Sequence, residues 1–209
     1  SIPVADGGEG SVDAFITAVG GVKEYVTVKN PYFEDMESYF GLIDAGQTAV
    51  IEMASCAGLP LVEDRKDPRL TTTYGVGQLI LAAARKGVKK IIVGLGGSST
   101  NDGGCGAAAA VGIRFYDRDG RQFIPTGGTT ADIDRIDLSG RDSLLEQVEI
   151  VTMCDIDNPM YGPVGASFIF GPQKGADEAM VLQLDEGIRN LGRVIAQATG
   201  TDISQVPGK

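Results

Sequence analysis

The first half of the chain begins with hydrophobic patterns of two kinds. Alternating or β-branched residues predict strands over 22–28, 36–43 and 48–53, with an Asn-Pro turn and an Asp-Ala-Gly turn between them. A helical pattern over 12–19 precedes these strands. Strands that follow one another through short turns are typical of antiparallel pairing, so we expect the three to form an antiparallel meander.

A parallel unit is predicted next. Apolar residues recur at helical spacing from Val76 to Ala84, after a run of three threonines. A β-branched run over 89–93 follows and predicts a buried strand. Strand 48–53, this helix and strand 89–93 together predict a right-handed β-α-β unit. The loop that follows then lies at the carboxyl end of its strand, where open α/β sheets bind ligands.

The second half predicts shorter elements and one long helix. Small residues predict a helix over 105–111, and β-rich runs predict strands over 114–117 and 148–153. A segment of glycine and threonine over 126–130 is expected to be a surface loop. Asp177 begins a long amphipathic helix whose role is packing. These patterns predict an α/β fold in which helices pack on a mixed sheet.

Composition limits the functions open to the chain. Its 209 residues are 43% hydrophobic, enough for a substantial core. The 28 acidic and 18 basic residues give a net charge of −10, which disfavours nucleic acid and anionic membranes as partners. Because the sequence contains no histidine, acid–base catalysis by histidine and metal ligation by histidine are both excluded. Cys56, Cys105 and Cys154 lack metal-site spacing and are expected to be reduced core residues of a cytoplasmic protein.

Residues 94–104, here called the glycine loop, carry the densest candidate chemistry. The loop joins strand 89–93 to helix 105–111, and free N–H groups at a helix N-terminus favour a bound anion. Asp102 either caps the helix or holds a cation. The alternative is a tight turn whose glycines serve geometry only. The candidates for binding phosphate or carboxylate are Gly96, Gly97, Ser98, Ser99, Thr100 and Asn101.

Two familiar phosphate-binding motifs do not describe this loop. A Walker A motif requires Gly-Lys followed by Ser or Thr, which occurs nowhere in the chain. A dinucleotide-binding fingerprint requires glycine where Ser99 stands. Recognition of an anion here would therefore use a different pattern.

Acidic candidates lie in two further loops. Asp6 and Glu9 stand among glycines before helix 12–19, where they can meet a metal or a substrate hydroxyl, or simply begin the helix. Asp155 and Asn158 follow strand 148–153, where they can ligate Mg²⁺ or accept a proton, or form a turn before proline. The pattern leaves both alternatives open in each loop.

Two other residues complete the candidate set. Thr73 stands at the hydroxyl-rich start of the helix that includes Val76, where it can approach a ligand or cap the helix. Lys174 lies in a rigid Pro/Gly turn, where it offers a fixed positive charge to an anion or is an ordinary surface lysine.

Taken in order, these motifs resemble those of the type I glycerate kinases, a bacterial family that phosphorylates D-glycerate with ATP. The resemblance covers nearly the whole chain. The matching stretches are Ala-Asp-Gly-Gly-Glu-Gly at 5–10, Thr-Thr-Tyr-Gly-Val-Gly-Gln-Leu-Ile at 72–80, the glycine loop, Cys-Asp at 154–155 with Asn-Pro at 158–159, and Phe-Gly-Pro-Gln-Lys-Gly at 170–175.

The resemblance implies a domain arrangement. Members of the family are considerably longer, and their flanking segments build a second α/β domain into which a part like this chain is inserted. We therefore expect residues 1–209 to form a single α/β domain similar to that inserted domain, domain 2 of the family. The flanking first domain is largely absent from the sequence, so half of the cleft between the domains is not represented.

The resemblance also implies an activity, the ATP-dependent phosphorylation of D-glycerate to a phosphoglycerate, with ATP and Mg²⁺. Asp102 or Asp155 would bind Mg²⁺ or accept the hydroxyl proton, Asp6 is a further catalytic candidate, and Lys174 would be the charge clamp. Glycerate and phosphate would contact the six loop residues above together with Glu9, Thr73 and Asn158. A homo-oligomer is compatible with this assignment.

Two alternatives remain at this stage. One is a non-catalytic domain that binds small carboxylates or phosphorylated metabolites. The other is a kinase that acts on a related hydroxy acid.

Overall fold

A five-stranded mixed sheet forms one half of the molecule. The computed structural model describes residues 7–206. The strand order is β1-β2-β3-β4-β8, with β1/β2 and β2/β3 antiparallel and β3/β4 and β4/β8 parallel. The predicted meander and mixed sheet are therefore confirmed. The strands are β1 (Val22–Lys29), β2 (Asp35–Ile43), β3 (Thr48–Glu52), β4 (Lys90–Gly94) and β8 (Glu149–Met153).

The register of the parallel strands brings three carboxyl ends together. Glu52 of β3 pairs with Gly94 of β4, and Gly94 pairs in turn with Met153 of β8. Helix α3 (Tyr74–Arg85) connects β3 to β4, as the pattern predicted. The loops that follow β4 and β8 consequently leave the sheet side by side at one edge.

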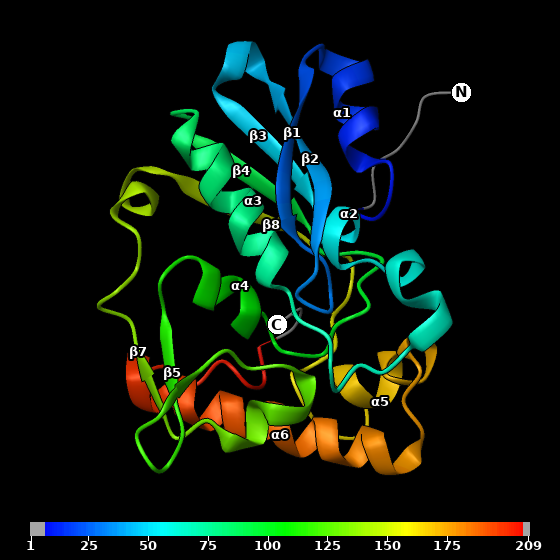
Figure 1. Cartoon of the computed structure of the whole chain (residues 1–209), viewed down its shortest axis with the longest axis vertical. Coiled ribbons are helices and arrows are strands. Elements are labelled where there is room, and N and C mark those ends of the chain that lie inside the picture. The colour runs from blue at the N-terminus through cyan, green and yellow to red at the C-terminus, as the bar shows by residue number, and fades with distance from the viewer. Residues whose placement is uncertain (1–6, 207–209) are drawn as a thin grey trace.

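Alternation along the strands divides the core between the two faces of the sheet. Ala49 and Ile51 of β3 pack with Leu79 of α3 in the main cluster, whereas Val50 packs with Val12 of helix α1 (Ser11–Val19). Helix α3 therefore covers one face and α1 the other, and Figure 1 shows both beside the sheet. Strands β1 and β8 are the two edge strands of this sheet, and Ile150 of β8 is 44% exposed.

The long helix α6 (Glu178–Thr199) organises the other half and runs along the bottom of Figure 1. It begins as predicted, because Asp177 accepts a hydrogen bond from the Met180 N–H at 2.8 Å. A second cluster joins it to α4 and a small antiparallel sheet of order β6-β5-β7. The elements of this half are α4 (Cys105–Ala110), β5 (Arg114–Tyr116), β6 (Gln122–Phe123), β7 (Arg135–Asp137) and α5 (Ala166–Phe170).

The prediction that 126–130 is a surface loop is wrong. The segment leads into a 3-10 helix (Gly127–Asp132) packed against α6, and Thr130 is fully buried. The side-chain amide of Asn190 donates to the carbonyls of Thr130, Ala131 and Ile133. These bonds satisfy backbone oxygens that a buried turn would otherwise leave without partners, which allows a Gly/Thr segment to lie inside the protein.

No helix within residues 7–206 is long and apolar enough to cross a membrane.

Candidate active site

A pocket of about 400 Å³ lies at the edge where β4 and β8 end. Its wall combines the glycine loop, the loop after β8, helix α5 and the turn that follows α5. The end of the short helix α2 (Ala54–Ala57) supports the glycine loop through backbone hydrogen bonds: the Ala57 carbonyl accepts from the Ser99 N–H at 2.8 Å, and the Leu59 N–H donates to the Gly97 carbonyl at 3.0 Å. The lining residues are Gly8, Leu95, Gly96, Gly97, Ser98, Cys154, Asp155, Ile156, Ala166, Phe170, Gln173 and Lys174.

The first part of the glycine loop needs glycine because another backbone lies against it. Gly96 donates its N–H to the Gly7 carbonyl at 3.0 Å. A Cβ on Gly94 would stand 2.4 Å from that same carbonyl oxygen, and one on Gly96 would stand 2.9 Å from Gly8. Residues 7–10, here called the N-terminal loop, can therefore lie on the glycine loop only because these positions lack side chains.

We expect the Gly94→Ala variant to be destabilised by roughly 1–3 kcal/mol, because its methyl group would meet rigid backbone rather than a movable side chain. Urea unfolding monitored by circular dichroism measures the effect. Gly192→Ala is the matched control, since a Cβ there meets nothing closer than 3.6 Å and alanine favours the helix. Equal unfolding midpoints for the two variants would contradict the close-packing argument.

The later residues of the loop are buried away from the pocket wall. The Ser99 hydroxyl donates to the Ala57 carbonyl at 2.9 Å, and Asn101 donates to the Ser167 hydroxyl at 3.1 Å. Ser99, Thr100 and Asn101 are all at most 6% exposed. The structure thus places Gly96, Gly97 and Ser98 on the pocket wall and the other three behind it, and the binding roles of all six stay predictions.

Asp102 joins the N-termini of two helices. Its Oδ2 accepts hydrogen bonds from the Thr73 N–H and hydroxyl, both at 2.8 Å, and from the Gly106 N–H at 3.1 Å. Its Oδ1 accepts from the Gly104 N–H at 3.1 Å. Burial raises the pKa of Asp102, and the hydrogen bonds from Thr73, Gly106 and Gly104 oppose that shift. The contacts are those of a helix cap, and the catalytic and metal-binding roles stay predictions.

Thr73 contributes to the same junction. It stands at the N-cap position of α3 but makes no side-chain cap to that helix. Its hydroxyl donates to Asp102 and accepts from the Ala107 N–H at 2.9 Å, so it links α3 to α4. Thr73 is 3% exposed and does not line the pocket.

Lys174 is a buried cation on the pocket wall. The residue is only 8% exposed, and its Nζ donates to the Thr100 carbonyl at 2.5 Å. Burial lowers the pKa of Lys174 to about 8, although the charge of Asp102 opposes the shift. The amine is therefore mostly protonated at neutral pH. The structure excludes the ordinary surface lysine that the sequence left open.

Among the predicted carboxylates that the structure describes, Asp155 is the one on the pocket wall, and it is exposed. Glu9 is exposed in the N-terminal loop and is not a lining residue, while Asn158 donates to the Val164 carbonyl at 2.8 Å. Asp6 lies outside the described residues. Within residues 7–206 there is no group of three or more Cys, Asp or Glu side chains placed to hold a metal by themselves.

Sequence reasoning missed several residues near the site. Phe170 and Gln173 line the pocket. Both belong to the 170–175 stretch that resembles the family, so that resemblance could have identified them. Ser167 contacts Asn101 from α5, and Glu52 lies buried at the end of β3. Neither of these two stands out by periodicity or motif, so only the folded arrangement identifies them.

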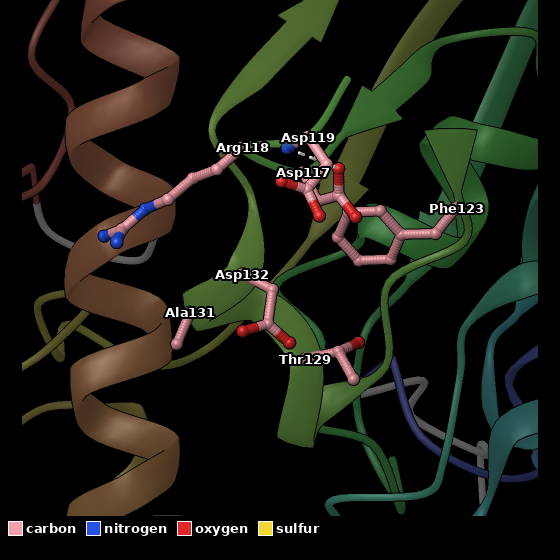
Figure 2. Close-up of a pocket in the computed structure, with 7 residues that line it drawn as sticks. All are labelled: Asp117, Arg118, Asp119, Phe123, Thr129, Ala131 and Asp132. Carbon is pink, nitrogen blue, oxygen red and sulfur yellow. Dashed lines mark hydrogen bonds between the residues drawn. The ribbon is translucent and has the colours of Figure 1, made fainter. Parts of the chain in front are cut away.

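A second hollow, of about 530 Å³, lies away from these groups, between the β5–β6 turn and the 3-10 helix beside α6. Figure 2 shows Asp117, Asp119 and Phe123 on one side of it and Asp132 on the other, with Arg118 extending towards α6. The Asp117 carboxylate accepts from the Asp119 N–H at 2.9 Å, which is turn geometry. We place the candidate site in the 400 Å³ pocket because the glycine loop, Asp155 and Lys174 meet there.

Known proteins are similar to this chain over nearly its whole length. A glycerate kinase from Bacillus cereus is 45% identical over 208 residues, which cover 99% of this chain and 55% of that protein. A glycerate 2-kinase from Escherichia coli K12 is 44% identical over 209 residues, covering 100% and 55%. A crystal structure described as "putative glycerate kinase 2" from Salmonella typhimurium LT2 has a TM-score of 0.94 and 39% identity, covering 99% of this chain and 56% of that one.

The chain thus spans about half the length of the relatives it matches. The model of the glycerate kinase family matches residues 1–209, and on this ground the chain belongs to the glycerate kinase family.

Proposed function

We propose that this chain supplies one wall of the active site of a kinase that transfers the γ-phosphoryl group of ATP to D-glycerate and releases ADP and a phosphoglycerate. The observation that carries the proposal is that Gly96 to Ser98 of the glycine loop and the buried cation Lys174 line one pocket. Membership of the family and the printed names of the relatives support the substrate assignment. The relatives' names do not favour a non-catalytic binding domain.

The groups on the wall suit an anionic substrate. Within residues 7–206, Lys174 uses one of its three N–H groups on the Thr100 carbonyl, which leaves two for oxygen atoms of a phosphate or carboxylate in the pocket. Gly96, Gly97 and Ser98 bring backbone and hydroxyl groups to the same wall. Phosphoryl transfer depends mainly on positioning and on neutralising charge, so this wall would orient the transferring group and hold its negative charge.

We propose Asp155 as the contribution of this chain to Mg²⁺ binding. Magnesium in kinase sites is bound through one or two carboxylates together with substrate phosphates and water, so one exposed carboxylate on the pocket wall fits that requirement. The oxygens of Asp102 fit it less well, because four protein donors already occupy them. When bound, the ion would neutralise charge on the phosphates.

We further propose that residues 1–209 correspond to the inserted domain of a longer enzyme. The share of the relatives that the chain covers, close to 55%, supports this arrangement. A cytoplasmic enzyme is consistent with the three cysteines, all of which are free thiols. Cys56 and Cys105 are buried as predicted, whereas the prediction of a core position is wrong for Cys154, which is exposed.

The test is ADP release from Mg²⁺-ATP, with and without D-glycerate. Two proteins should be compared: the 209-residue chain and a chimera that adds the flanking segments of the Bacillus cereus relative. We expect turnover that depends on D-glycerate in the chimera, and a panel of related hydroxy acids identifies the preferred acceptor. A folded chimera that binds D-glycerate but never releases ADP would contradict the proposal and favour the binding domain.

A further inference from the structure

Glu52 is a buried carboxylate that the proposed chemistry does not use. It ends β3 and is 1% exposed. Its Oε2 accepts a hydrogen bond from the Ser11 N–H at 3.0 Å, and its Oε1 accepts one from the Tyr39 hydroxyl at 2.7 Å. The ion pairs formed within residues 7–206 do not include it. Since no cation of the described residues pairs with this carboxylate, the hydrogen bonds from Ser11 and Tyr39 are its stabilising contacts in that part of the chain.

The position of Glu52 connects it to the pocket. Because Glu52 pairs with Gly94, its backbone lies beside the first residue of the glycine loop. Ser11 is the first residue of α1, and the N-cap residue Gly10 provides no side-chain acceptor. Glu52 therefore supplies, from a neighbouring strand, an acceptor for the N–H of the first helical residue, which has no partner inside the helix. Its negative charge also suits the positive end of the helix dipole.

The N-terminal loop is consequently held at both ends. At one end the Gly7 carbonyl accepts the Gly96 N–H at 3.0 Å. At the other end Ser11 donates its N–H to Glu52 at 3.0 Å and makes a longer bond of 3.3 Å to the Gly8 carbonyl. Gly8, which lines the pocket, lies between these two points.

We propose that Glu52 is a positioning residue that anchors the N-terminal loop on the glycine loop and so fixes Gly8 in the pocket wall. Glu52 itself is not a lining residue, and it acts through Ser11. The effect on catalysis rests on the proposed function, whereas the anchoring does not.

Hydrogen–deuterium exchange of the 209-residue chain tests the anchoring. In Glu52→Ala, we expect the amides of residues 7–12 to exchange roughly tenfold to a hundredfold faster, because the Ser11 N–H loses its charged acceptor. Amides of β4 should keep their wild-type rates. Unchanged exchange over 7–12, or equal acceleration throughout the protein, would overturn the proposal, since the second result indicates a general loss of stability.

Two further variants test whether the hydrogen bonds of Glu52, rather than the loss of any carboxylate, explain the faster exchange. Glu52→Gln keeps an oxygen for the Ser11 N–H and an amide that can donate to the Tyr39 oxygen, so we expect exchange within about threefold of wild type. Glu37→Ala removes an exposed carboxylate from β2 and should leave exchange over 7–12 unchanged. An acceleration in Glu52→Gln equal to that in Glu52→Ala would count against the hydrogen-bond anchor.

Steady-state kinetics of the chimera test the catalytic consequence. A pocket wall that contacts the bound substrate and the transition state equally affects KM alone, so we expect Glu52→Ala to raise the KM for a substrate about tenfold with kcat within about threefold. The Gln variant should return KM towards the wild-type value. A fall in kcat with unchanged KM would contradict the positioning role. A wild-type chimera without turnover would contradict the proposed function instead, and the exchange result would still decide the anchoring.

Discussion

Replacing Asp102 with asparagine is expected to lower the free energy of unfolding by about 2–4 kcal/mol. All four partners donate to the Asp102 carboxylate, so the contacts favour its ionised form, although burial raises its pKa. Even in its better orientation, an asparagine places an N–H₂ group against the Gly104 N–H and weakens the bonds from Thr73. Urea unfolding monitored by circular dichroism at neutral pH measures the loss.

Asp155→Asn is the matched control, because that carboxylate is exposed on the pocket wall. We expect its unfolding free energy to stay within about 0.5 kcal/mol of wild type, as at most exposed positions. We therefore expect Asp102→Asn to lose mainly stability, and Asp155→Asn to lose mainly the turnover of the chimera. Lost turnover with an unchanged unfolding midpoint in Asp102→Asn would restore the catalytic role that the sequence predicted for Asp102.

Replacing Lys174 with methionine should reduce kcat/KM of the chimera by about a hundredfold to a thousandfold, the usual effect of removing a donor that stabilises transition-state charge. Methionine fills a similar volume but carries no charge. Turnover of the chimera measures the loss. Lys89→Met, at an exposed lysine just before β4, is the control and should keep wild-type turnover. Equal turnover in both variants would exclude Lys174 from substrate binding.

The Lys174→Met variant also tests how the stability of the protein depends on pH. The pKa of Lys174 is about 8 in the folded protein against 10.5 for an ordinary lysine, so the unfolded state binds the proton more tightly. The cost of burying the charged amine is therefore fully present below pH 8 and is relieved as the pH rises towards 10.5. We expect the stability of the wild type relative to Lys174→Met to increase between pH 7 and pH 10. A pH-independent difference between their unfolding midpoints would contradict this account of the burial.

Much of the fold could be predicted because periodicity is a local property. The alternation in β1 to β3 and the helical spacing in α3 are each visible within a dozen residues, and they indicated the meander and the crossover unit. The burial of Thr130 could not be found in this way. It depends on Asn190, which lies 60 residues later in the sequence and satisfies its carbonyl oxygen.

The position of the glycine loop in the fold could also be predicted, whereas the contacts of its residues could not. The glycine loop was expected at the carboxyl end of a strand, and the pocket lies there. The burial of Lys174 depends on Thr100, 74 positions away, and the cap formed by Asp102 depends on Thr73, 29 positions away. Glu52 looks like any residue of a strand until Ser11 is placed beside it. A motif identifies the residue types, but only tertiary contacts decide which atoms remain available to a ligand.

The pocket wall also has a consequence for the order of folding. Gly8 and Lys174 are more than 160 positions apart in the sequence, yet both line the same pocket. Contacts between such distant segments carry a large entropy cost of loop closure. The β1–β2 hairpin carries a smaller cost, because it pairs segments that are neighbours in the sequence. We therefore expect the sheet to form early and the pocket to close last, so that ligand binding during refolding would report the final step of assembly.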